Sequence, residues 1–258
     1  MSQAEDIKEL AAELEIKCAR EPSVRVVQSD DSDFTVSQSL SGSLSTTGPL
    51  ALADVDNDGD LDLFIGGRAI PGQYPKPANS RLLLNNKGKL EPDVAADKVF
   101  KAVGLVSGAV FGDLDGDGDA DLVLACEWGP VKVFENDKGN FKDATARFGM
   151  ENHLGWWNSV TLGDLDGDGR LDIVAGNWGR NSKYEQSYRE GEPLKIFYAD
   201  FDGNGQLDII EAHTDKEMKS LVPERGFSCT SRAMDFVRDR CKTFKGFGTS
   251  SLQVVIGE

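Results

Sequence analysis

The stretch GDLDGDGDADLVLACEWGPVKVFEN, at residues 112–136, combines an acidic, glycine-rich loop with two apolar segments. The segments ADLVLA (120–125) and VKVFEN (131–136) show the short apolar runs and alternation typical of β-strands. The residues Asn136-Asp137-Lys138-Gly139 end the second segment, and they predict a hairpin turn because Asn and Asp tolerate left-handed backbone and Gly favours it. The stretch therefore predicts an acidic loop followed by short strands.

The acidic loop occurs four times along the chain. Every copy fits the pattern D-x-D-x-[DN]-G-x-x-D, whose positions we number one to nine. Loops one to four are DVDNDGDLD (54–62), DLDGDGDAD (113–121), DLDGDGRLD (164–172) and DFDGNGQLD (200–208). Their first aspartates are separated by 59, 51 and 36 residues. A period of roughly 40 to 50 residues with short strands is typical of propeller blades, and the short last spacing predicts a compact blade or a strand supplied from elsewhere.

Further short apolar or alternating segments predict strands between about residue 24 and residue 210. They are VRVV (24–27), LALAD (50–54), LDLFIG (61–66), RLLLN (81–85), LDIVAG (171–176) and LKIFYAD (194–200). A second turn sequence, Asn85-Asn86-Lys87-Gly88, predicts another hairpin. We therefore predict an all-β fold, a β-propeller with four recognisable calcium-loop blades over residues 23–213.

The two ends of the chain show a different pattern. Residues 1–22 predict an amphipathic helix that ends at Pro22, since apolar residues fall on one face. Residues 214–250 predict a mostly helical insertion, with Ser231–Arg240 as one helix. The final segment, 251–258, contains LQVVI and predicts the start of a further strand.

The charge of the protein is concentrated in the four loops. The 258 residues include 28 Lys and Arg against 44 Asp and Glu, a net charge of −16. The loops hold 17 of these acids and one base, Arg170, so the remaining 27 acids and 27 bases cancel. A protein this acidic is a poor partner for nucleic acid or an anionic membrane, and no apolar run approaches the roughly 18 residues of a membrane-spanning helix.

The pattern of the loops predicts calcium binding, with up to four ions as cofactors. Hard oxygen ligands at alternate positions and a glycine for a sharp turn are what a flexible calcium site requires. Position seven is predicted to act through its backbone carbonyl, which explains why it varies in residue type. The candidate metal ligands are Asp54, Asp56, Asp58, Asp60 and Asp62; Asp113, Asp115, Asp117, Asp119 and Asp121; Asp164, Asp166, Asp168, Arg170 and Asp172; and Asp200, Asp202, Asn204, Gln206 and Asp208.

Other metals and another calcium motif fit less well. Magnesium prefers fewer protein carboxylates, and soft transition metals require His or Cys, which the loops lack. Only two histidines, His153 and His213, argue against a zinc site. Loop four matches an EF-hand through Glu211 at position twelve, but its flanking segments predict strands rather than helices. We therefore expect Glu211 to be a surface strand residue.

Cysteines and tryptophans complete the candidate features. Cys126 lies in an apolar strand and is expected to be a buried free thiol. Cys229 and Cys241 would lie about 18 Å apart along one helix, too far to pair. The tryptophans predict either packing between blades, which we favour because aromatic residues dominate core energetics, or a surface that stacks on sugars. They are Trp128, Trp156, Trp157 and Trp178.

The loops and their flanking strands resemble the FG-GAP/VCBS-type repeats of calcium-binding β-propellers, which include those of integrin α-subunits. The closest resemblance is to the large VCBS-repeat proteins related to cartilage acidic protein. The resemblance is carried by residues 53–75, 112–136 and 155–184 and continues through YADFDGNGQLDII (198–210). It implies an extracellular or cell-surface propeller of about seven blades. Because four loops and no signal peptide are visible, we expect a fragment of such a propeller.

These observations predict a non-catalytic, calcium-binding module for extracellular adhesion or for recognition of a protein or glycan ligand. The sequence contains no serine-hydrolase or phosphate-binding motif, and we predict no catalytic and no organic cofactor-binding residues. An enzyme related to the polysaccharide lyases that use calcium-loop propellers is the alternative, and a purely structural scaffold is a third reading. We expect that the protein does not bind nucleic acid and does not insert into a membrane.

Overall fold

The computed structural model describes residues 24–30, 33–179, 182–187 and 191–257. The predicted helix at 1–22 lies outside these residues. The chain divides into two units, residues 1–43 and 44–258, each considered by itself. In the first unit, β1 (Val24–Asp30) and β2 (Asp33–Leu40) form an antiparallel hairpin with a bulge between Val26 and Val27.

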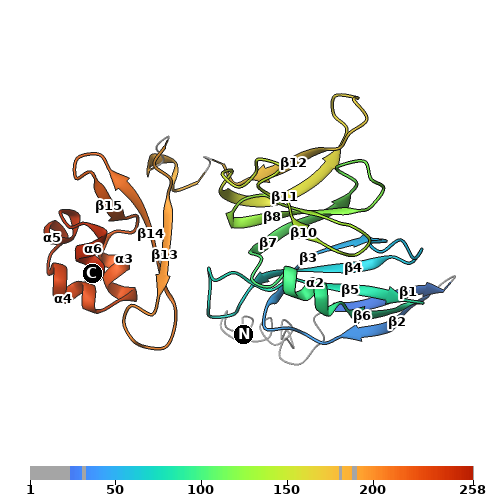
Figure 1. Ribbon diagram of the computed structural model, residues 1–258. Coiled ribbons are helices and arrows are strands. Elements are labelled where there is room, and N and C mark those ends of the chain that lie inside the picture. Colours follow the sequence, from blue (N-terminus) through green and yellow to red (C-terminus); the bar gives the residue numbers. More distant parts are fainter. Residues whose placement is uncertain (1–23, 31–32, 180–181, 188–190, 258) are drawn as a thin grey trace, which may run out of the picture. The chain divides into compact units, whose positions relative to one another are not determined.

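The second unit begins with a four-stranded antiparallel sheet (Figure 1). Its strands follow each other in space as in sequence: β3 (Thr46–Ala53), β4 (Asp62–Ala69), β5 (Arg81–Asn86) and β6 (Lys89–Pro92). The Asn85–Gly88 turn joins β5 to β6, as the sequence predicts. Helix α2 (Val94–Val99) follows, and it begins at Asp93, whose carboxylate accepts hydrogen bonds from the amides of Ala95 and Ala96.

The next sheet repeats this order and extends it. Its strands are β7 (Leu105–Gly112), β8 (Asp121–Gly129), β9 (Lys132–Glu135), β10 (Lys142–Asp143), β11 (Gly155–Gly163) and β12 (Asp172–Asn177). The spatial order is β10-β9-β8-β11-β12, and β7 also pairs with β8. The Asn136–Gly139 turn connects β9 towards β10, so the second predicted hairpin is confirmed as well.

The last sheet holds three antiparallel strands, β13 (Lys195–Ala199), β14 (Asp208–Asp215) and β15 (Ser220–Pro223), after the 3-10 turn η1 (Glu185–Ser187). Four short helices follow and gather beside this sheet in Figure 1. They are α3 (Phe227–Ala233), α4 (Phe236–Cys241), α5 (Phe244–Gly248) and α6 (Leu252–Ile256). Their apolar residues, including Met234, Val237 and Val255, form one core with Ile210 and Ala212 of β14.

Two predictions for this region are wrong. The segment 251–258 is not the start of a strand, because Leu252, Val255 and Ile256 lie three and four residues apart on one helical face and pack into the core. Ser251 caps this helix by accepting a hydrogen bond from the amide of Val254. The predicted helical insertion 214–250 begins with strand residues, and Ser231–Arg240 is broken between α3 and α4 at Met234.

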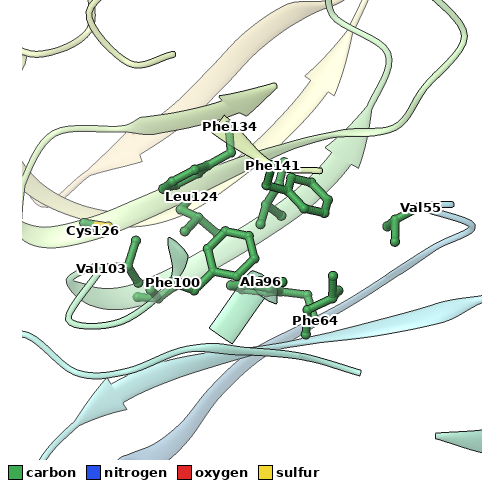
Figure 2. Close-up of a cluster of buried hydrophobic side chains, with 12 residues drawn as sticks. Val55, Phe64, Ala96, Phe100, Val103, Leu124, Cys126, Phe134 and Phe141 are labelled. Atoms are coloured by element: carbon green, nitrogen blue, oxygen red, sulfur yellow. The ribbon is translucent and has the colours of Figure 1, made fainter. Parts of the chain in front are cut away.

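The main core of the second unit lies between the first sheet, α2 and the β7–β10 strands. Figure 2 shows Phe100 of this core between Phe64 and Phe134, and the ring centroids of both pairs are 5.2 Å apart. Cys126 belongs to the same cluster and is buried and unpaired, as expected. Cys229 and Cys241 are also free thiols.

The first strands of neighbouring repeats approach each other closely at glycines. A Cβ atom on Gly48 of β3 would lie 2.9 Å from the carbonyl oxygen of Val106 in β7, and one on Gly108 of β7 would lie 2.9 Å from the amide nitrogen of Val160 in β11. Only glycine allows this spacing without a shift of the backbone. Two successive contacts between β3, β7 and β11 are therefore built in the same way.

The described part of the chain is mostly β with a few short helices. Its sheets do not close into a ring, so the propeller stays a prediction. Among the described residues, the helices are all too short to pass through the apolar part of a bilayer.

Candidate metal centres

The four acidic loops occupy one equivalent place in the fold. Each connects the first strand of a repeat to the second, between β3 and β4, β7 and β8, β11 and β12, and β13 and β14. The two strands pair antiparallel up to the loop, with Ala53 opposite Asp62 and Gly112 opposite Asp121. The strand pairing therefore brings positions one and nine of each loop close together, although eight residues separate them in sequence.

The aspartate at position one organises the turn. In loop one, Oδ1 of Asp54 accepts a hydrogen bond from the amide of Asp58 at 3.1 Å, and Oδ2 accepts one from the amide of Gly59 at 2.9 Å. The bond to the position-six glycine recurs in the other loops at 3.0, 2.9 and 2.9 Å. In each of the four loops, the backbone therefore curls around the carboxylate at position one.

Two positions of each loop have left-handed backbone. Position six has φ between 85° and 95°, which accounts for its invariant glycine within this chain. Position four also has positive φ, and it is occupied by Asn57 (62°), Gly116 (81°), Gly167 (78°) and Gly203 (75°). The role of position four was not predicted from the sequence, although its restriction to Asn and Gly in all four loops is a signal for left-handed backbone.

The structure brings one group of three carboxylates together in every loop. In each group, one oxygen from each of three side chains lies within 4.8 Å of the other two. Calcium binds oxygens at about 2.3–2.6 Å, so two ligands of one ion are at most about 5 Å apart. The donor set thus fits calcium. The groups are Asp54, Asp56 and Asp58; Asp113, Asp115 and Asp121; Asp164, Asp166 and Asp172; and Asp200, Asp202 and Asp208.

Position nine also fastens the loop to the sheet. Asp62 accepts hydrogen bonds from the amides of Val55 and Asn85, at 2.9 and 2.7 Å, and Asp121 accepts equivalent bonds from Leu114 and Asn136, both at 2.9 Å. Both aspartates are 1% exposed. Burial raises the pKa of each carboxyl, and the two amide bonds oppose this rise. A bound cation would also favour the charged form.

Position seven lies outside all four groups of three carboxylates. The Asp60 side chain accepts a hydrogen bond from the amide of Lys87 at 3.2 Å, and Asp119 accepts one from the amide of Lys138 at 3.1 Å. Both carboxylates therefore engage a neighbouring hairpin turn. The amides of Arg170 and Gln206 donate to position five of their own loops, at 2.8 Å in each case. A metal-binding role for the backbone carbonyl of position seven stays a prediction.

The loops differ in how far the rest of the fold covers them. Val55, at position two of loop one, is 1% exposed, and its carbonyl oxygen accepts a hydrogen bond from the side chain of Asn136 at 2.8 Å. The equivalent Leu165 in loop three is 72% exposed. Loop one is thus packed against the second repeat, whereas loop three is open to solvent.

Glu211, expected at the surface, is instead 3% exposed. Its carboxylate accepts hydrogen bonds from Nε and Nη2 of Arg225, at 2.8 and 2.9 Å, and from the Tyr184 hydroxyl at 3.0 Å. These ion-pair contacts account for its burial. Glu211 belongs to none of the carboxylate groups. Strands flank loop four on both sides, whereas an EF-hand would need helices there.

Comparison with known families agrees with this geometry. Residues 113–175, which span loops two and three and the strands between them, match the family described as FG-GAP-like repeat. This segment is similar to FG-GAP-like repeats. No curated protein matches the chain. Loops one and four lie outside the matched segment, but they share the hydrogen bond from the position-six amide to the position-one carboxylate. Loop four also groups the carboxylates of positions one, three and nine, as loops two and three do, whereas loop one groups those of positions one, three and five.

Proposed function

We propose that the protein is a non-catalytic, calcium-binding FG-GAP-like module of β-propeller type that recognises a protein or glycan ligand outside the cell. The observation that carries the proposal is the set of four carboxylate groups, one in each loop, with donor oxygens within 4.8 Å of one another. One such group is common on acidic surfaces. Four at equivalent positions of four repeats favour a shared ligand over chance.

Calcium would be held by the side chains at positions one and three, with position five or nine as the third carboxylate. When bound, the ion supplies positive charge that offsets the repulsion between these carboxylates. Position one directly follows the first strand of each pair and position nine begins the second, so the ion would join those strands at the loop. Its role in the proposal is therefore structural, and up to four ions would contribute.

The propeller part of the proposal rests on how the repeats follow each other. The first strands β3, β7 and β11 meet at Gly48 and Gly108 through the same close approach. Repeats that pack side by side through their first strands are typical of propeller blades. The resemblance to extracellular FG-GAP-type proteins supports the proposed location and adhesive role.

Tyr74 and Tyr184, whose hydroxyls are hydrogen-bonded to the buried Glu127 and Glu211, bear on the lyase alternative. Burial raises the pKa of Tyr74 to about 12, and burial together with the neighbouring Glu211 raises the pKa of Tyr184 as well. A tyrosine with a raised pKa stays protonated at neutral pH and is a poor general base. These two hydroxyls are therefore poor candidates for the proton-removing base that the lyase alternative requires.

Calcium titration tests the proposal. Isothermal calorimetry is expected to detect up to four ions, and calcium at one hundred times its dissociation constant should stabilise the protein by about 2.7 kcal/mol per site. Asp113→Asn with Asp115→Asn should remove one site. Asp137→Asn, a turn residue outside the carboxylate groups, should leave the stoichiometry unchanged. Equal thermal unfolding in calcium and in chelator would refute the proposal.

A further inference from the structure

A cavity of about 660 Å³ lies beside the end of β8, away from the carboxylate groups. Its lining includes Trp128, Trp156, Trp178 and Tyr184, together with Ile196 and Phe197 of β13. The volume lies within the roughly 300–1,000 Å³ range of small-molecule pockets. Nothing in the calcium proposal uses this cavity.

The four aromatic rings form one continuous wall. Ring centroids are 5.1 Å apart for Trp128 and Trp156 and 4.3 Å apart for Trp156 and Trp178, while Tyr184 lies 6.4 Å from both Trp128 and Trp178. The pairing of β11 with β8 creates the wall, because it places Trp156 opposite Glu127, next to Trp128. Trp178 is 42% exposed, so the wall reaches solvent on one side.

Trp128 is held in place by a chain of hydrogen bonds. Its Nε1 donates to the Tyr74 hydroxyl at 2.6 Å, and that hydroxyl donates to Oε1 of Glu127 at 3.0 Å. The other carboxylate oxygen of Glu127 pairs with Arg68. Glu127 is 6% exposed and both its oxygens are engaged. This glutamate therefore positions the ring and is not itself presented to a ligand.

Tyr184 is held in a similar way on the far side of the wall. Its hydroxyl donates to Glu211, which is paired with Arg225. Each of the two rings is therefore fixed by a buried glutamate that is paired with an arginine: Glu127 fixes Trp128 through Tyr74, and Glu211 fixes Tyr184 directly. Rings locked by such contacts lose little conformational freedom when a ligand binds, which is the condition for a preorganised site.

The lining of the cavity indicates the chemistry of the ligand. Among the described residues that line it, Glu185 and Lys195 are the charged ones, and their charges balance. A balanced lining favours a neutral ligand. The Lys183 ammonium already lies 4.7 Å from the centre of the Tyr184 ring, which disfavours a second cation there.

Polar groups occur beside the aromatic wall. Asn177 and Ser182, which carry polar side chains, also line the cavity. A neutral ligand that matches this wall needs apolar faces to stack on indole rings and hydroxyl groups along its edge to bind polar side chains. A pyranose ring has both features, since its C–H bonds form the faces and its hydroxyls point outwards.

We propose that this cavity binds a neutral oligosaccharide, whose sugar rings stack on Trp156 and Trp178. The proposal rests on the recognition part of the proposed function and makes that ligand a glycan; it does not depend on calcium. Neighbouring Trp157 has a different role. Its indole packs with Val123, Val131 and Val133, and its Nε1 donates to the carbonyl oxygen of His153 at 3.0 Å. Trp157 is therefore a packing residue, which is the role favoured for the tryptophans from the sequence.

The test uses tryptophan fluorescence titration and a glycan array. The probes are neutral gluco-, galacto-, manno- and xylo-oligosaccharides, with sulfated and uronic-acid oligosaccharides and tetramethylammonium for comparison. Binding of at least one neutral series is expected. Trp156→Ala and Trp178→Ala should each weaken it by about tenfold or more, whereas Trp157→Phe should change it by less than about twofold.

Several outcomes would overturn the proposal. These are binding of the charged probes alone, no binding of any neutral series, or binding that survives both Trp156→Ala and Trp178→Ala. The calcium-dependent shift in unfolding temperature is measured on the same samples. A shift without sugar binding would remove this inference and leave the calcium proposal intact, and sugar binding without a shift would do the reverse. Circular dichroism confirms that each variant is folded.

Discussion

The side-chain amide of Asn57 donates a hydrogen bond to Oδ1 of Asp119 at 2.6 Å and so joins loop one to loop two. The two residues are 62 positions apart in sequence. Asp119 is 7% exposed, and its other oxygen accepts a bond from the amide of Lys138. Asn57 thus has two structural roles: its side chain binds Asp119, and its backbone adopts the left-handed conformation required at position four.

Substitutions at Asn57 should separate these two roles. Asn57→Gly keeps the backbone conformation but loses the bond to a carboxylate, so we expect a loss of about 1–2 kcal/mol in the free energy of unfolding. Asn57→Ala loses the same bond and also the tolerance of Asn for left-handed backbone, which should cost about 1 kcal/mol more. Urea unfolding of both variants measures the difference. Equal losses would contradict a conformational role for this position.

The glycine at position six should be required only because its backbone has a positive φ, and not because space for a side chain is lacking. In loop three, Gly169 has φ +85°, and a Cβ atom there would meet no atom within 4 Å. Gly169→Ala should therefore destabilise the protein by about 1–2 kcal/mol through backbone strain. Gly163 in β11 has equally open space but no positive φ, so Gly163→Ala should be neutral or slightly stabilising. Thermal unfolding compares the pair, and similar losses would refute the explanation.

The core beneath the first sheet depends on Phe100. This side chain is fully buried and touches the rings of Phe64, Phe134 and Phe141. Phe100→Ala should lower the free energy of unfolding by about 3–5 kcal/mol, because the cavity cannot be refilled easily. Val99, the preceding residue, is 37% exposed, and Val99→Ala should cost less than about 1 kcal/mol. Chemical denaturation of both variants checks the contrast.

Glu211 should make stability depend on acidic pH. Burial alone would raise the pKa of this carboxyl, but hydrogen bonds from Arg225 and Tyr184 outweigh it and lower the pKa to about 2. The folded protein therefore binds this proton less readily than the unfolded chain does. The resulting stability is complete above the unfolded pKa, near 4.5, and is lost as pH falls towards 2.

Glu211→Gln tests this dependence. The variant should be less stable than the wild type at neutral pH by about 1–2 kcal/mol, since the half-exposed Arg225 is screened by solvent. The difference should shrink between pH 4.5 and 2, where the wild-type carboxyl also becomes neutral. Unfolding curves at several pH values measure it. A difference that is independent of pH across this range would contradict the assignment.

Much of the local structure followed from residue patterns. The predicted strands from LALAD (50–54) to LKIFYAD (194–200) are all present, although β3 begins and β8 ends four residues beyond the predicted segments. Their existence could be predicted because alternation and β-branched residues act over short distances. The segment LQVVI (252–256) was predicted wrongly because four apolar residues among five fit both a strand and a short helix. Packing against β14 decided between them.

Some of the candidate site residues could be predicted from local sequence, and others could not. The spacing of acids and glycines within a loop sets its local hydrogen bonds, so the loops could be located from sequence. Glu211 and the tryptophans could not be placed, since their surroundings come from distant segments. Glu211 meets Arg225 and Tyr184, and Trp156 meets Trp128 through the pairing of β11 with β8. No local pattern encodes such contacts.

The sequence by itself determined four acidic loops, the strands around them and a charge of −16 that these loops carry. It could do so because each loop is nine residues long and its conformation depends on its own carboxylates and glycines. Only the tertiary structure decided which loops are covered, which carboxylates face one another and which tryptophans form a wall. Strand pairing and burial set these features, and both depend on residues far apart in the chain.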